Sequence, residues 1–186
     1  MGAIALNDEG LHNQLKYNQL IYGAVPSPFD CWLAHRGLKT LHLRVREACR
    51  NALLIGKALE RSPHVLAVYY PGLESHPDRS IVCKQHREGM AGGVLSFRIE
   101  GGRDAAITFC RATKIFALAV SLGGVESLVE LPSNMTHARI PKEQREESDL
   151  LDDLIRLSCG VEDGEDLRED VLQALETVAH DKALAI

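Results

Sequence analysis

The sequence predicts an α/β protein in which one long helix leads into a small two-layer α+β domain. Apolar residues recur at three- and four-residue steps from Phe29 to Leu59, the period of a helix that buries one face. Residues 93–101 alternate between apolar and polar side chains, as in a strand with one buried face. An apolar stripe over residues 165–180 predicts a helix that packs on a sheet. Together these patterns predict helices covering one side of a sheet of about four strands.

Two elements are expected before the long helix, a short strand over residues 1–8 and a helix from Leu11 to Tyr22. The long helix has a clear start signal, because Ser27 can accept a hydrogen bond from a first-turn N–H and Pro28 suits the first helical position. It is expected to end near Pro63. A helix of about 30 residues is about 45 Å long, so we expect it to connect two domains.

Beyond the long helix, short strands are expected to alternate with helices. The expected strands are 64–70, 93–101, 115–120, which is apolar enough to be buried, and 154–160; the expected helices are 104–113, 141–149 and 165–180.

Composition points to a soluble globular protein. Lys and Arg number 21 against 26 Asp and Glu, a net charge of −5, which argues against nucleic acid as a partner. No apolar run approaches the roughly 20 residues of a membrane helix, so no membrane association is expected. The first ten residues carry acids instead of the positive charge of a signal or transit peptide, so the expected location is the cytoplasm.

Two features could carry chemistry. Ser121-Leu122-Gly123-Gly124 follows an apolar strand, where the glycines either let the backbone approach a ligand or simply form a turn, and from the residues alone the turn is favoured. Arg156 interrupts the apolar strand 154–158, where its charge must point to solvent or meet an anion such as a carboxylate. The eight histidines are scattered without metal-ligand spacing, so no metal site is expected.

Five stretches of the chain are distinctive in both sequence and order. They are Gly-Ala-Val-Pro-Ser-Pro-Phe-Asp at 23–30, Arg-Gly-Leu-Lys-Thr-Leu at 36–41, Tyr-Pro-Gly-Leu with Ser-His-Pro at 70–77, Ser-Leu-Gly-Gly with Met-Thr-His at 121–137, and Leu-Ile-Arg-Leu-Ser at 154–158 within 154–163. Over nearly all 186 residues they resemble the cystathionine gamma-lyases, pyridoxal-phosphate enzymes of cysteine and methionine metabolism.

The resemblance implies the C-terminal part of a fold-type I pyridoxal-phosphate-dependent transferase. Residues 1–26 would be the end of the large cofactor domain, 27–62 the long linking helix, and 63–186 the small C-terminal α+β domain. The implied cofactor is pyridoxal 5'-phosphate, and the implied assembly is a homotetramer built from dimers. The implied reaction is that of transsulfuration, in which the amino acid cystathionine is converted to cysteine, 2-oxobutyrate and ammonia.

The resemblance also assigns substrate-binding residues. Arg156 matches the arginine that clamps the substrate α-carboxylate, Ser121 matches a serine beside it, and Thr136 matches a threonine lining the same pocket. The family usually has glutamate where this chain has Val120, facing the distal part of the substrate. An apolar residue there favours an apolar thioether, so a methionine gamma-lyase or a cystathionine gamma-synthase-like member is the alternative.

The lysine that holds the family's cofactor has no counterpart in this sequence. The family carries it in a Ser-x-x-Lys stretch shortly before the segment that residues 1–3 resemble, and none of the seven lysines, at positions 16, 39, 57, 84, 114, 142 and 182, has that context. Without it there is neither an imine-forming amine nor a general base. We therefore expect a C-terminal fragment with no catalytic residue, inactive alone; the alternative is a non-catalytic domain that associates with full-length subunits.

Overall fold

The computed structural model describes residues 1–184 of the chain, and side-chain burial for residues 1–181. The chain forms two compact units, Met1–His42 and Leu43–Ile186. Helix α2, Pro28–Glu60, contributes residues to both units. No helix within the described range is long and apolar enough to cross a membrane.

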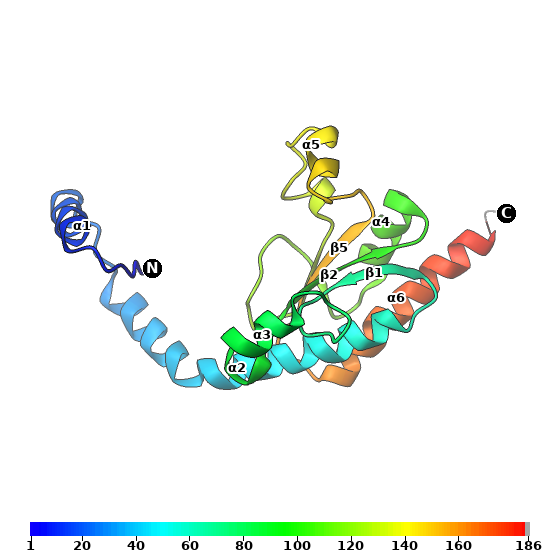
Figure 1. The fold of residues 1–186 in the computed structure, drawn as a ribbon, viewed down its shortest axis with the longest axis horizontal. Coiled ribbons are helices and arrows are strands. Elements are labelled where there is room, and N and C mark those ends of the chain that lie inside the picture. Colours follow the sequence, from blue (N-terminus) through cyan, green and yellow to red (C-terminus); the bar gives the residue numbers. More distant parts are fainter. Residues whose placement is uncertain (185–186) are drawn as a thin grey trace. The chain divides into compact units, whose positions relative to one another are not determined.

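The first unit contains helix α1, Glu9–Tyr22, and the beginning of α2 (Figure 1). Helix α2 starts where the cap signal predicts, because Ser27 Oγ accepts a hydrogen bond from the Asp30 N–H at 3.1 Å. The strand predicted for residues 1–8 is wrong, since these residues form no regular structure. A strand needs a neighbour to pair with, and no described segment pairs with this one.

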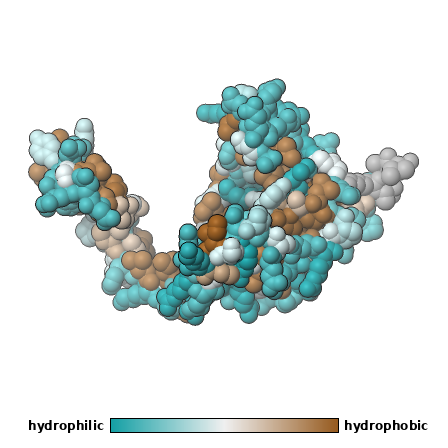
Figure 2. Space-filling view, in the orientation of Figure 1, coloured by the Kyte–Doolittle hydropathy of each residue, from teal (hydrophilic) through white to brown (hydrophobic). Residues whose placement is uncertain are grey.

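Large apolar side chains lie exposed on the first unit. Figure 2 shows them as brown surface along α1 and the start of α2. Tyr22, Phe29, Trp32 and Leu38 are each more than half exposed, and the rings of Phe29 and Trp32 stack on one another with centroids 6.1 Å apart. The regular apolar period of α2 is therefore real, but within the described chain only the C-terminal half of this helix buries it.

The second unit is built on a five-stranded sheet in the order β1-β2-β5-β4-β3. The strands are β1 Val65–Tyr69, β2 Val94–Ile99, β3 Ala117–Leu118, β4 Leu128–Glu130 and β5 Leu154–Ser158. Neighbours pair antiparallel except β3 and β4, which are parallel. The helices are α3 Arg79–Gln85, α4 Gly102–Ala112, α5 Lys142–Glu147 and α6 Gly164–Leu184, with 3₁₀ turns at Arg87–Gly89 and Pro132–Asn134.

One face of this sheet forms the hydrophobic core. Alternate residues of β2, including Phe97, are buried in one cluster with Ile155 and Leu157 of β5 and with side chains of α2, α4 and α6. Phe97 meets Phe109 of α4 edge to face, with ring centroids 5.3 Å apart. The three helices therefore cover one face, as predicted, and the intervening side chains of each strand point to the other face.

Three further elements differ from the sequence prediction. Strand β4 was not expected, because three buried residues are too few to show a strand period. Strand β3 is only two residues long and exposed, although residues 115–120 predicted a buried strand, because it lies at the edge of the sheet. Helix α3 was also missed, being only seven residues long. The sheet therefore has five strands instead of about four.

A buried carboxylate fixes the turn that leads into β3. Asp170 of α6 accepts hydrogen bonds from the backbone N–H groups of Lys114, Ile115 and Phe116 at 2.7, 2.8 and 3.1 Å. Its side chain also accepts a bond from the Gln173 amide at 3.0 Å. Backbone donors that would otherwise be buried without a partner are satisfied in this way. The edge of the sheet is thereby tied to the helical layer.

Candidate functional site

Two charged residues lie side by side on neighbouring strands of the sheet. Glu130 on β4 and Arg156 on β5 are directly paired in register, and Ser96 on β2 pairs with Arg156 from the other side. Since Ile155 and Leu157 point into the core, Arg156 lies on the face opposite the helical layer. The Glu130 side chain is only 1% exposed and the Arg156 side chain 19% exposed. A nearly buried ion pair thus lies on the face of the sheet opposite the helices α2, α4 and α6.

The ion pair joins two further residues into one cluster. The Nη2 group of Arg156 donates to Glu130 Oε2 and to the backbone carbonyl of Ser121, the latter at 2.9 Å. Thr136 Oγ1 donates to the other oxygen of Glu130, Oε1. Both oxygens of the buried carboxylate are therefore satisfied, one by a cation and one by a hydroxyl.

The loop carrying Ser121 is bonded to the last residue of β5. Gly123 adopts a φ of +75°, which favours glycine, and its N–H donates to Ser158 Oγ at 2.9 Å. The Gly-Gly pair after β3 is therefore a turn, and this turn also brings the Ser121 carbonyl to Arg156. The turn that the residues favour is therefore present, and approach of this backbone to a ligand stays a prediction.

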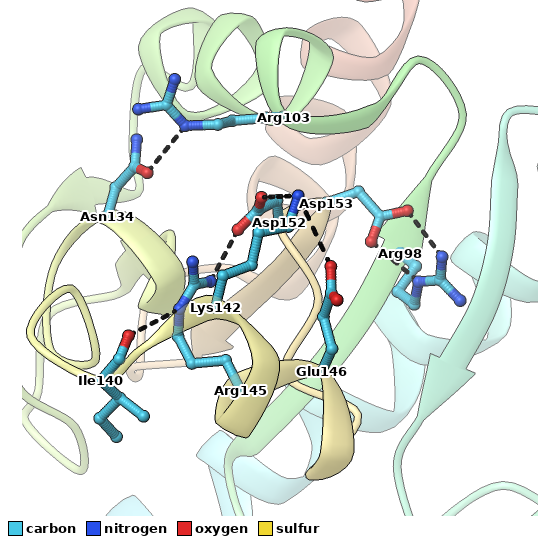
Figure 3. Close-up of polar contacts among 9 residues, drawn as sticks. All are labelled: Arg98, Arg103, Asn134, Ile140, Lys142, Arg145, Glu146, Asp152 and Asp153. Atoms are coloured by element: carbon cyan, nitrogen blue, oxygen red, sulfur yellow. Dashed lines mark hydrogen bonds and ion pairs between the residues drawn. The ribbon is translucent and has the colours of Figure 1, made fainter.

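A network around α5 fixes the segment between Thr136 and β5 (Figure 3). Arg145 donates from Nη1 to Asp152 Oδ1 at 2.6 Å and from Nε to the carbonyl of Ile140 at 3.3 Å. Lys142 Nζ lies 3.7 Å from Asp152 Oδ2. The hydrogen bond from Arg145, followed by the nearby positive charges, holds the pKa of Asp152 below its usual value.

A second ion pair on the same face anchors the start of β5. Arg98 of β2 binds Asp153 through two parallel hydrogen bonds of 2.9 Å, from Nε and Nη2 (Figure 3). Arg103 of α4 donates to Asn134 Oδ1 at 3.0 Å, next to the turn that precedes Thr136. These contacts fix both ends of the segment that carries Thr136.

The structure brings together three of the four predicted site residues. Arg156 forms the ion pair with Glu130, and Ser121 and Thr136 both bond to that pair. Val120 lies beside Ser121 with 55% of its surface exposed. Their roles in substrate binding, and that of Val120, remain predictions. Sequence reasoning missed Glu130. The signal was present, since Glu130 is a lone charge in the apolar run Leu-Val-Glu-Leu, just as Arg156 is in Leu-Ile-Arg-Leu.

The cluster fits a carboxylate better than it fits pyridoxal phosphate. The cofactor's aldehyde needs a lysine amine, yet among the described residues no lysine is a polar partner of Arg156, Glu130, Ser121 or Thr136. Arg156, by contrast, has the planar donor fork that matches a carboxylate. Within the described part of the chain, no group of three or more His, Cys, Asp or Glu side chains could hold a metal ion.

Removing the Asp152 charge tests whether the α5 network stabilises the fold. Because the pKa of Asp152 is lowered in the folded chain, its ion pair stabilises the fold above the unfolded pKa, and this stability is lost as pH falls through the folded value. We expect Asp152→Asn to lower the free energy of unfolding by about 0.5–1 kcal/mol at pH 7. This difference should shrink as the pH falls below about 4, the usual pKa of an aspartate, because the carboxyl then becomes protonated.

Urea denaturation at a series of pH values measures this difference. Asp149→Asn is the matched control, because Asp149 is exposed and has no cationic side-chain partner within the described chain. A difference for Asp152→Asn that is independent of pH would contradict the assignment.

Comparison with known proteins places this chain in a family. Residues 1–176 match the family described as Cys/Met metabolism PLP-dependent enzyme. Cystathionine gamma-lyase of Saccharomyces cerevisiae is 53% identical over 177 residues, which are 95% of this chain and 45% of that protein. The crystal structure of cystathionine gamma-lyase from yeast aligns with a TM-score of 0.90 over 94% of this chain and 45% of that chain.

A solved methionine gamma lyase from Micromonospora echinospora is 40% identical, with a TM-score of 0.83 over 92% of this chain and 45% of its own. The chain therefore spans about 45% of the length of the yeast protein it matches. The resemblance inferred from the sequence motifs is confirmed, and the chain belongs to the Cys/Met metabolism PLP-dependent enzyme family.

Proposed function

We propose that this chain is the C-terminal part of a pyridoxal-phosphate-dependent carbon–sulfur lyase similar to cystathionine gamma-lyase, in which Arg156 binds the α-carboxylate of the substrate. The reaction would convert cystathionine and water to cysteine, 2-oxobutyrate and ammonia. Residues 1–26 would complete a large cofactor domain, 27–62 would link it, and 63–186 would form the small domain. A homotetramer in the cytoplasm belongs to the same proposal.

The observation that supports this proposal most directly is the hydrogen bonding of the Arg156 guanidinium. Its Nη2 group is bound to Glu130 and Ser121, while Nε and Nη1 have no partner among the described residues. The side chain is 19% exposed, so an anion can reach it where water screens the interaction only partly. An amino-acid carboxylate would meet N–H donors whose position is already fixed by Glu130.

The other site residues would complete the recognition of an amino acid. Thr136 is held by Glu130, and the Ser121 carbonyl contacts Arg156, so both lie on the face of the sheet that carries Arg156. Pyridoxal phosphate, when bound in such an enzyme, supplies the electron sink for elimination. In this proposal the lysine that holds it is contributed by residues outside this sequence, and the part of the reaction done here is to bind and orient the substrate.

Methionine gamma-lyase activity is the second candidate, and Val120 favours it. The residue is 55% exposed and its side chain is apolar, so it offers no partner to a charged distal group and suits a thioether carbon chain. A cystathionine gamma-synthase-like member would share the same carboxylate site.

A chimera in which this chain replaces the matching segment of the yeast relative tests the proposed function and separates the two candidate substrates. The chimera should turn over cystathionine if this chain supplies a working carboxylate site. Val120→Glu should raise the ratio of cystathionine to methionine turnover by about 10-fold or more, because a carboxylate would attract a charged distal group. Val125→Glu is the matched control, since Val125 is equally exposed at 53% in the same loop region and should leave the ratio unchanged.

An inactive but folded chimera would overturn the proposed function. Equal ratios of cystathionine to methionine turnover in the two glutamate variants would show that Val120 does not determine substrate specificity.

The chain alone should be catalytically silent. We expect that incubation with pyridoxal phosphate, reduction with borohydride and peptide mapping will find no lysine labelled in preference to the others, and that cystathionine will not be turned over. One specifically labelled lysine together with turnover would show that this chain forms its own cofactor site. Co-purification of the silent chain with a full-length homologue would favour the alternative of a non-catalytic domain that docks on intact subunits.

A further inference from the structure

Both N–H groups of Arg156 Nη2 are already in use. One donates to Glu130 Oε2 and the other to the Ser121 carbonyl at 2.9 Å. A guanidinium carries five N–H donors in a rigid plane, two on each Nη and one on Nε. Among the described residues the remaining three, on Nη1 and Nε, have no acceptor. The free donors are therefore confined to Nη1 and Nε.

This arrangement blocks both ways of clamping a carboxylate. A carboxylate can accept two parallel hydrogen bonds from the Nη1–Nη2 edge or from the Nη2–Nε edge, whereas the third edge is covered by the Cδ carbon. Each of the two open edges includes one N–H of Nη2. A two-point clamp on Arg156 therefore requires Nη2 to give up either Glu130 or Ser121.

Glu130 is the acceptor that should stay. It is a charged group with 1% of its side chain exposed, and its second oxygen is held by Thr136. Releasing it from Arg156 would leave a buried carboxylate without its cation, a change that costs several kcal/mol in proteins. Its position on β4, directly paired with Arg156 on β5, is also fixed by the strand register.

Ser121 is the acceptor that can leave. Its carbonyl is neutral and belongs to an exposed loop, where Val120 and Leu122 are each 55% exposed, so water can replace Arg156 as its partner. Ser121 also has a φ of +153°, a backbone conformation that side-chain-bearing residues rarely adopt. The loop is held again at Gly123 by its bond to Ser158 Oγ, which limits any shift to the residues before it.

We infer that the Ser121 carbonyl is a displaceable stand-in for the substrate α-carboxylate on Arg156. This inference rests on the proposed function, in which an amino acid binds at Arg156. When the carboxylate replaces the Ser121 carbonyl as the acceptor of the Nη2 N–H, residues 120–122 move. Gly123 meanwhile stays bonded to Ser158. Because Val120 lies in the moving segment, recognition of the carboxylate at one end of the substrate sets the position of the residue that faces the other end.

Nuclear magnetic resonance of the labelled 186-residue chain tests this coupling. Acetate is the probe for the carboxylate, and acetamide is the matched neutral control. We expect acetate to shift the Arg156 Nε–H signal and the Ser121 carbonyl ¹³C signal with the same midpoint, the carbon moving upfield as it loses its hydrogen bond to Arg156. The Gly123 amide should change little, and acetamide should shift none of these signals.

Two outcomes separate the inference from the proposed function. If acetate shifts Arg156 Nε–H in a saturable way while the Ser121 carbonyl carbon stays unchanged, the displacement is wrong and carboxylate binding stands. If neither signal responds up to about 100 mM acetate, about ten times a Kd of 10 mM, both fail. The variant Ser121→Ala retains the carbonyl and should show the same coupled shifts, because the backbone and not the hydroxyl carries the effect.

Discussion

The candidate site depends on one interaction, the ion pair between Glu130 and Arg156 across neighbouring strands. Thr136 reaches the site by bonding to Glu130, and the Ser121 loop reaches it by bonding to Arg156. A slip of one residue between β4 and β5 would turn Arg156 toward the hydrophobic core. The strand register therefore determines whether Arg156 can form the proposed carboxylate site.

Such a pair contributes position more than stability. Desolvation offsets much of the attraction between buried charges, whereas loss of one partner leaves the other unpaired at a high cost. Arg156 is thus held in place by Glu130, and in our inference the substrate carboxylate reaches its Nη2 group by displacing the Ser121 carbonyl. The family membership of the chain gives that anion an identity in our proposal, the α-carboxylate of a sulfur-containing amino acid, while the cofactor lysine is expected from outside this sequence.

Sequence reasoning succeeded where the signal was long or chemically distinct. Elements that the structure contains were predicted by the apolar repeat along α2, the cap at Ser27 and the alternation in β2. It failed where tertiary pairing decides. Residues 1–8 have no strand partner in the described chain, and β4 is too short to show a period. Glu130 was missed for a related reason, since a lone charge in an apolar run reveals its partner only when the strand order is known.

A double-mutant cycle on Glu130 and Arg156 tests the central claim most directly. The free energy of unfolding would be measured by urea denaturation for the native chain, Glu130→Gln, Arg156→Gln and the double variant. If the two side chains form the nearly buried pair described here, the double variant should lose about 1–3 kcal/mol less than the sum of the single changes. Changes that add to within about 0.5 kcal/mol would contradict the account, because they would mean that the two charges do not interact.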